Sequence, residues 1–312
     1  MLTMKSTASV YDESLAYACI QSLSVPSLRS ATTRCVYSIF YNFFFRQYRA
    51  AWLPGRIPVS RVDHPLDQKI PFTPSWVTIY LDFVTFWVRM VSFLLRKFGR
   101  RAFKGTQEFI ATMGQVYTFA AEVYQANLST TNRPFYIATP RFALIHLVDP
   151  HLMCIPSLHV MVVIRTYTKF AAILRSLNET ERCAAQANEM KQGALAIAQA
   201  ILFVKQHSIN CISASLYAMT CFDETLFPPE EAEAFTGLMF SPPPPAAFSP
   251  EGRLPRNHRL RPSAAPRTKL PEADACAIKA HIIGLYRRFL AEGKTAQRWV
   301  DPLLNFMRQC PR

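Results

Sequence analysis

Three side chains in this sequence have the chemistry needed to move a phosphoryl group. They are Arg133, His159 and His207, and each lies beside a proline or a polar run at the edge of an apolar segment. An arginine can bind a phosphate through two parallel hydrogen bonds. A neutral histidine can attack phosphorus, while a second, protonated histidine can protonate the departing alkoxide. The alternative is that these are interfacial polar residues that cap helices.

Two neighbouring residues extend this candidate phosphate site. Ser157 follows Pro156 and directly precedes an apolar segment at 158–174. A helix starting there would direct its first backbone N–H groups and its positive dipole end toward an anion. Lys205, two residues before His207, could add positive charge.

The composition limits the kinds of protein that could carry such a site. The 312 residues include 35 Lys and Arg against 21 Asp and Glu, a formal net charge of +14, yet only 18% are charged and half are apolar. A basic, aromatic-rich, charge-poor chain is typical of a membrane protein with basic loops or of a nucleic-acid binder. The positive run at 96–104 lies at one helix end and does not recur along a groove, so we expect no nucleic-acid partner.

Apolar periodicity predicts an all-α, polytopic membrane bundle of about six transmembrane helices with a Pro-rich basic C-terminal tail. In the segment 75–95, 15 of 21 residues are apolar, close to the roughly 20 residues that span a bilayer. Asp82 and Arg89 are seven residues apart on one helical face, which in lipid must look into the protein. A buried helix of a soluble domain is the alternative. The six predicted helices are 35–53, 75–95, 107–124, 158–174, 184–205 and 208–222.

Four regions are predicted along the chain. An N-terminal polar segment, 1–34, precedes the membrane domain, 35–222, and a Pro-rich basic linker, 223–271, follows it. Within the last region, 272–312, the apolar residues Ile278, Ile282, Leu285 and Phe289 form a helical stripe, which predicts an amphipathic helix.

Topology predicts where the candidate residues meet. If the basic loop at 96–106 is cytoplasmic, the connection 125–157 and the turn at 205–207 share the opposite face, and the tail after 222 is cytoplasmic. We therefore expect a multi-pass protein of the plasma (inner) membrane with its active site on the extracytoplasmic face.

The ordered motifs resemble those of the type 2 phosphatidic acid phosphatase superfamily. They are Arg-Pro at 133–134, Pro-Ser-Leu-His at 156–159 and Lys-Gln-His at 205–207, and the resemblance covers roughly residues 60–222. It is nearest to the branch that includes inositol phosphorylceramide and sphingomyelin synthases, helped by the segment 67–74 leading into Tyr80. Family members are six-helix membrane enzymes that act on lipid phosphates and diphosphates or move phosphorylated head groups between lipids.

The resemblance implies a role for each candidate residue. His207 matches the nucleophile that forms a phosphohistidine, and His159 matches the general acid for the leaving group. Arg133 and the backbone at Ser157 match the phosphate clamp, with Lys205 as an added positive charge. The resemblance implies no metal and no cofactor, and a membrane lipid phosphate or diphosphate in the bilayer as the substrate.

The sequence also departs from the family pattern. The acidic residue usual four positions after the nucleophile is Cys211 here, and a thiol cannot fix the imidazole tautomer as a carboxylate does. Asn210 could orient the ring instead, and Asp149 is a more distant candidate. Basic family positions are Ala126 and Ile201 here. Two hypotheses follow: a lipid-phosphate phosphatase or head-group phosphotransferase, or a non-catalytic protein of the same fold that binds lipid or a partner.

Overall fold

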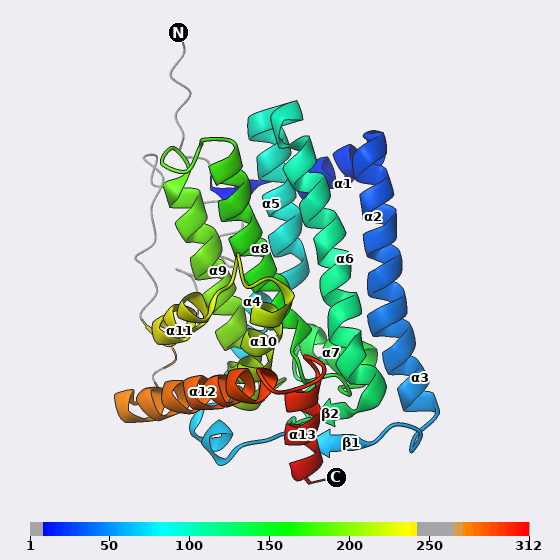
Figure 1. The fold of residues 1–312 in the computed structure, drawn as a ribbon, viewed down its shortest axis with the longest axis vertical. Helices are drawn as coiled ribbons and strands as arrows, with labels where there is room; N and C mark the ends of the chain where they lie inside the picture. Colours follow the sequence, from blue (N-terminus) through cyan, green and yellow to red (C-terminus); the bar gives the residue numbers. More distant parts are fainter. Residues whose placement is uncertain (1–8, 242–265, 267, 269, 312) are drawn as a thin grey trace.

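The computed structural model describes residues 9–241, 266, 268 and 270–311, which form a mostly helical protein (Figure 1). The helices of the bundle and its flank are α1 (Leu15–Ser24), α2 (Pro26–Ile39), α3 (Arg46–Trp52), α5 (Phe83–Phe98), α6 (Phe103–Ala126), α8 (Leu158–Ser176), α9 (Ala184–Phe203) and α10 (Ile209–Phe222). The shorter or peripheral helices are α4 (Val77–Tyr80), α7 (Pro140–Val148), α11 (Pro229–Leu238), α12 (Glu272–Gly293) and α13 (Asp301–Gln309). A π-helical segment, η2 (Phe40–Phe45), joins α2 to α3, and the 3-10 helices are η1 (Val10–Asp12), η3 (Pro65–Lys69), η4 (Pro74–Trp76) and η5 (Gly99–Ala102).

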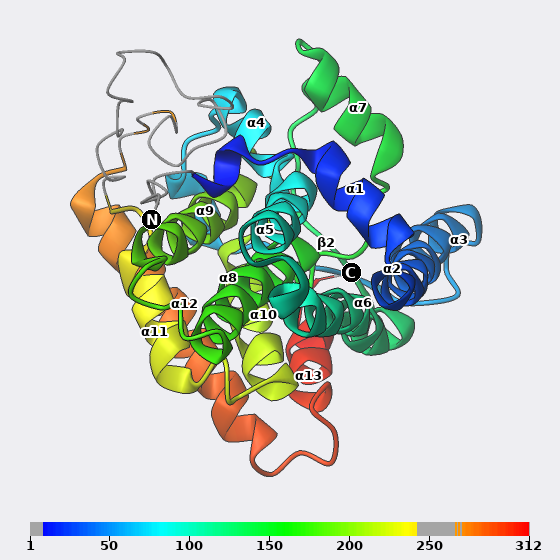
Figure 2. The same ribbon diagram turned by 90° about the horizontal axis from the view of Figure 1, so that it is seen from above.

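Helices α5, α6, α8 and α9 stand upright side by side, with α2 and α3 along one flank (Figures 1 and 2). α2 packs closely on α6 because Gly114 has no side chain there, and a Cβ at Gly114 would lie 3.1 Å from the Cα of Cys35. The Ser38 hydroxyl donates to the Gly114 carbonyl at 2.7 Å. Gly99, with φ +54°, ends α5 in a conformation that favours glycine, and the chain then turns into α6.

The all-α class and the predicted helices agree with the structure, but the first helix is longer than predicted. The predicted segment 75–95 contains α4 and most of α5, and the other four internal segments match α6, α8, α9 and α10. The first helix begins at Pro26, because Leu28 and Ala31 are buried although the segment is polar on average. Part of the N-terminal polar segment therefore belongs to the bundle.

One helical stretch of the described residues is long and apolar enough to cross a membrane. It runs from Pro74 to Ala126 with a mean hydropathy of 1.5, and 61% of its most apolar window is buried inside the protein. Asp82 and Arg89 both face inward and are 2% exposed, as their spacing predicts. The multi-pass arrangement itself stays a prediction.

The two ends of the bundle carry different connections. η5 and the turn between α8 and α9 lie at one end, and the segment between α6 and α8 returns to the other end, where α9 also meets α10 (Figure 1). At this second end β1 (Val59–Arg61) and β2 (Leu128–Thr130) pair in parallel, with Val59 opposite Leu128. The pairing holds the chain just before η3 against the chain just after α6.

The C-terminal region differs from the expected topology. Instead of lying at the basic end, α12 and α13 lie at the end that carries β1 and β2 (Figure 1). The Ser60 hydroxyl donates to the Met307 carbonyl at 2.8 Å, and the Arg61 backbone N–H donates to the Pro311 carbonyl at 2.7 Å. α12 lies there because it packs along α10: the Ser213 hydroxyl donates to the Ile282 carbonyl at 3.1 Å, and the Thr220 and Tyr286 hydroxyls are 2.9 Å apart.

The structure agrees with the predicted apolar stripe at 278–289 but only in part with the predicted linker at 223–271. α12 buries Ile278, Ile282, Leu285 and Phe289, so the predicted amphipathic helix is confirmed. The first part of the predicted linker is folded, since it forms the helix α11, in which Phe235 is buried. The proline run at 242–245 and the basic stretch up to 265 lie outside the described residues.

Candidate functional site

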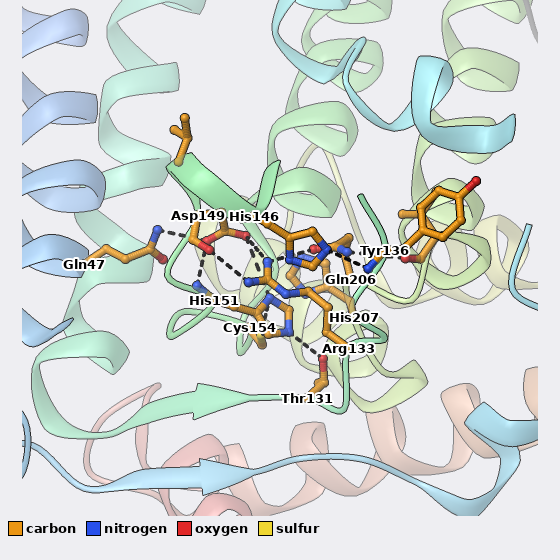
Figure 3. A network of polar contacts seen from close by, with 12 residues as sticks. Gln47, Thr131, Arg133, Tyr136, His146, Asp149, His151, Cys154, Gln206 and His207 are labelled. Carbon is orange, nitrogen blue, oxygen red and sulfur yellow. Dashed lines mark hydrogen bonds and ion pairs between the residues drawn. The ribbon is translucent and has the colours of Figure 1, made fainter. Parts of the chain in front are cut away.

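Three distant parts of the chain lie at the end of the bundle that carries the strands, and Figure 3 shows Arg133 and His207 there. Arg133 follows β2, His159 lies in the first turn of α8, and His207 lies in the turn between α9 and α10. The ring centroids of His159 and His207 are 5.5 Å apart. His159 and His207 therefore lie side by side, and Arg133 is connected to them through Asp149 and His151.

His207 has the state that a nucleophile needs. Burial, together with the neighbouring His159 and His151, lowers the pKa of His207 well below its usual range, against the opposing effect of Asp149. The neutral ring points Nε2 toward the Ser157 hydroxyl, 3.4 Å away. Nδ1 is buried and makes no well-formed hydrogen bond to any described residue. Nε2 is thus the ring nitrogen that faces the polar groups of the site.

His159 is held by aromatic packing. Its ring stacks on Tyr80 at a centroid distance of 4.5 Å and lies 4.2 Å from the ring of Phe83. These contacts fix the plane of the imidazole beside His207.

Arg133 is anchored on the rim of the site. Its Nη1 donates to Gln206 Oε1 and its Nη2 to the Asp149 carbonyl, both at 3.2 Å, and Nη1 lies 3.7 Å from the Asp149 carboxylate. Arg133 and Lys205 also line a cavity of about 560 Å³ whose wall includes Asp63. Arg133 therefore joins the Asp149 network to the wall of an open cavity.

The structure adds a residue that sequence reasoning did not assign, His151, which pairs with the orienting candidate Asp149. The His151 backbone N–H donates to Asp149 Oδ1 at 2.9 Å, and His151 Nδ1 lies 3.8 Å from Asp149 Oδ2. The other ring nitrogen of His151 lies 2.8 Å from the Thr131 hydroxyl, and its ring centroid is 6.3 Å from that of His207. Gln47, from α3, donates to Asp149 Oδ1 at 3.0 Å.

The charges of this pair follow from its contacts. Burial disfavours the imidazolium, but Cys154 and Asp149 outweigh burial and raise the pKa of His151 to about 10. Burial likewise disfavours the Asp149 carboxylate, but hydrogen bonds and charge from His151, with the charge of Arg133, lower its pKa. His151 and Arg133 thus place two positive charges around one negative charge beside His207.

The backbone of His151 is strained, with φ at +61°. A residue with a Cβ at positive φ costs about 1–3 kcal/mol, and such strain is concentrated at functional sites. The available sequence signal was modest: a histidine two residues after an aspartate and eight before His159.

Two members of the predicted phosphate clamp are used differently. The Ser157 backbone N–H donates to the Ser215 hydroxyl at 2.7 Å, so it is the Ser157 hydroxyl that faces His207. The Lys205 ammonium donates to the Asp67 carbonyl, and burial lowers the pKa of Lys205. Neither the backbone of Ser157 nor the ammonium of Lys205 points freely at an anion.

The candidate orienting residues also have other partners. Asn210 Oδ1 lies 2.7 Å from Nε2 of His281 in α12, and Asn210 Nδ2 donates to the Val62 carbonyl at 3.0 Å. Cys211 is fully buried in α10. Asp149 contacts His151 and Arg133, so the carboxylate nearest the site orients those two groups.

No family model, curated protein or solved structure matches this chain at a significant level. Among the described residues, His, Cys, Asp and Glu side chains do not form a group of three or more that could hold a metal ion.

Proposed function

We propose that this protein is a lipid-phosphate phosphatase or head-group phosphotransferase. One observation carries the proposal: His159 and His207 lie 5.5 Å apart, centroid to centroid, although 48 positions separate them in the chain. At that distance the two rings are in edge-to-face contact, so both imidazoles lie within reach of one phosphoryl group. The motifs resemble those of the type 2 phosphatidic acid phosphatase superfamily in the same order, which supports the same chemistry.

In the proposed first step, Nε2 of His207 attacks phosphorus. A P–N bond forms, the P–O bond to the leaving group breaks, and His159 gives its proton to the departing alkoxide. Water or an alcohol, activated by the now neutral His159, then attacks phosphorus and releases His207. Arg133 and the His151 imidazolium stabilise the negative charge on the phosphoryl oxygens.

The lipid character of the substrate and the membrane setting are part of this proposal. The apolar stretch Pro74–Ala126 and exposed aromatic residues on α2 and η2, such as Tyr37 and Phe40, support contact with a bilayer. We place the site on the extracytoplasmic face of a multi-pass protein of the plasma (inner) membrane, because the basic loop at the other end favours the cytoplasm.

Trapping of the covalent intermediate tests the proposal directly. The full chain, purified in detergent micelles, is mixed with phosphatidic acid or a lipid diphosphate labelled with ³²P at the transferable phosphate, and quenched after milliseconds. We expect label that is stable to alkali and released by acid, as for a P–N bond. His207→Ala should abolish the label and lower turnover at least about a thousandfold, and His159→Ala should slow both steps.

His146→Ala is the matched control, since His146 lies on the neighbouring α7 and takes no part in the mechanism. It should turn over at nearly the wild-type rate. If phosphatidic acid and lipid diphosphates are not turned over, and His207→Ala and His159→Ala behave as the wild type does, the enzyme function is excluded.

A second function, a non-catalytic lipid-binding protein of the same fold, is favoured by the unpaired Nδ1 of His207 and by the thiol at Cys211. Cys211→Asp separates the two. A large gain in turnover would identify a decayed enzyme, whereas a loss would identify a working site built around other groups.

A further inference from the structure

A second cavity, of about 510 Å³, lies at the same end of the bundle as the candidate site. It is bounded by the end of α3, the chain that follows it, the end of α6 and the segment at 152–153. Its wall includes the basic residues Arg46, Arg49 and Arg56. None of these residues takes part in the proposed chemistry.

The charge of this cavity has a single sign. Its lining contains no Asp or Glu, and none of the three arginines forms an ion pair with a described residue. Arg46 Nε donates to Asn42 Oδ1 at 3.3 Å, and its guanidinium lies 5.1 Å from the centroid of the Tyr41 ring. These contacts orient Arg46 without neutralising it, so the cavity attracts anions.

The rest of the cavity is apolar and continues into an exposed aromatic strip. Leu53, Ile57, Leu152 and Met153 contribute to its wall. On the flank of the bundle, Tyr37, Tyr41 and Phe45 stack in series at centroid distances of 5.9 and 5.5 Å, and each is at least 41% exposed.

Trp52, which lies between the lining residues Ala51 and Leu53 in the chain, is 78% exposed. Aromatic residues beside arginines are typical of the boundary between lipid tails and head groups.

We propose that this cavity binds the phosphate head group of an anionic phospholipid, whose acyl chains lie along the exposed strip of α2 and η2. Three arginines supply the charge that a phosphodiester requires, and the aromatic strip selects a lipid over a free anion. Because Leu152 and Met153 belong to the segment that carries His151, a bound lipid would pack directly against that segment. The proposal concerns binding alone and is independent of any reaction at His207.

Fluorescence quenching of Trp52 tests the site. The full chain in uncharged micelles is titrated with phosphatidylglycerol brominated on its acyl chains. We expect saturable quenching that Trp52→Phe removes. The triple variant with Arg46, Arg49 and Arg56 all changed to Gln should bind at least about tenfold more weakly, since it removes the positive charges that attract the head group. Because Arg49 and Arg56 are exposed, the double variant Arg49→Gln, Arg56→Gln gives a second measurement should the triple variant not fold.

The matched control removes three charges at the opposite end of α6, through Arg100→Gln, Arg101→Gln and Lys104→Gln, and should bind as wild type does. If brominated phosphatidylcholine quenches Trp52 as strongly as brominated phosphatidylglycerol does, the groove binds acyl chains without selecting an anionic head group, and the proposal is overturned. So would displacement of the lipid by millimolar inorganic phosphate alone, which would indicate a free-anion site. Unchanged affinity in both arginine variants would also overturn it, whatever the turnover of the enzyme.

Discussion

Two networks of opposite charges, one buried in the bundle and one at the rim of the candidate site, are built in different ways. In α5, Arg89 donates to Asp82 at 2.7 Å and to the Thr85 hydroxyl at 3.1 Å, so all three groups come from two turns of one helix. The network around Asp149 instead collects Arg133, His151 and Gln47 from loops and from a different helix.

The two networks differ in how much of the fold each one needs in order to form. A pair at i and i+7 is set by helical geometry and allows two charges to be buried, here with both side chains about 2% exposed. A network assembled from several segments exists only when all of them are in place. The second design can therefore hold charges next to a reacting group, and it depends on the whole fold.

Breaking the helical pair should have the largest effect on stability. Arg89→Met leaves Asp82 buried without a counter-charge, and we expect a loss of about 3–5 kcal/mol in the free energy of unfolding. Thermal unfolding in micelles measures it. The double variant Asp82→Leu, Arg89→Met should recover most of that stability, because no charge remains buried; equal destabilisation in both would show that the pair acts through packing alone.

Neutralising the second network should have a smaller and pH-dependent effect. His151→Gln keeps a polar side chain and the same positive φ but loses the charge, and we expect a loss of about 2 kcal/mol at neutral pH. The folded-state pKa of His151 is raised from 6.5 to about 10, so its contribution is complete below about pH 6.5 and is lost as the pH rises toward 10. Melting temperatures of the two proteins from pH 6 to 10 should converge; a constant gap would mean that the charge does not contribute.

The smallest effect should come from the link to α3. Gln47→Ala removes one hydrogen bond to the Asp149 carboxylate, which corresponds to about 1.5 kcal/mol. Because Asp149 positions Arg133, we also expect a higher KM for lipid phosphate with little change in kcat. Gln115→Ala, on the exposed face of α6, is the matched control. A change in kcat with unaltered KM would assign Gln47 a different role.

Much of the candidate site could be predicted from the sequence because its motifs are local. Arg133, His159 and His207 each lie in a short string next to an apolar segment, and topology alone predicts that the three share one end of the bundle. The inward orientation of Asp82 and Arg89 and the buried stripe of α12 follow from helical periodicity in the same way.

Only the tertiary structure decided which partner each polar group has. The sequence could not show that Asp149 contacts His151 and Arg133, that Asn210 contacts α12, or that Lys205 donates to the Asp67 carbonyl. It also could not show that α12 returns to the end of the bundle that carries the candidate site. Periodicity is a property of consecutive residues, whereas a hydrogen bond between distant segments depends on packing that fixes both of them at once.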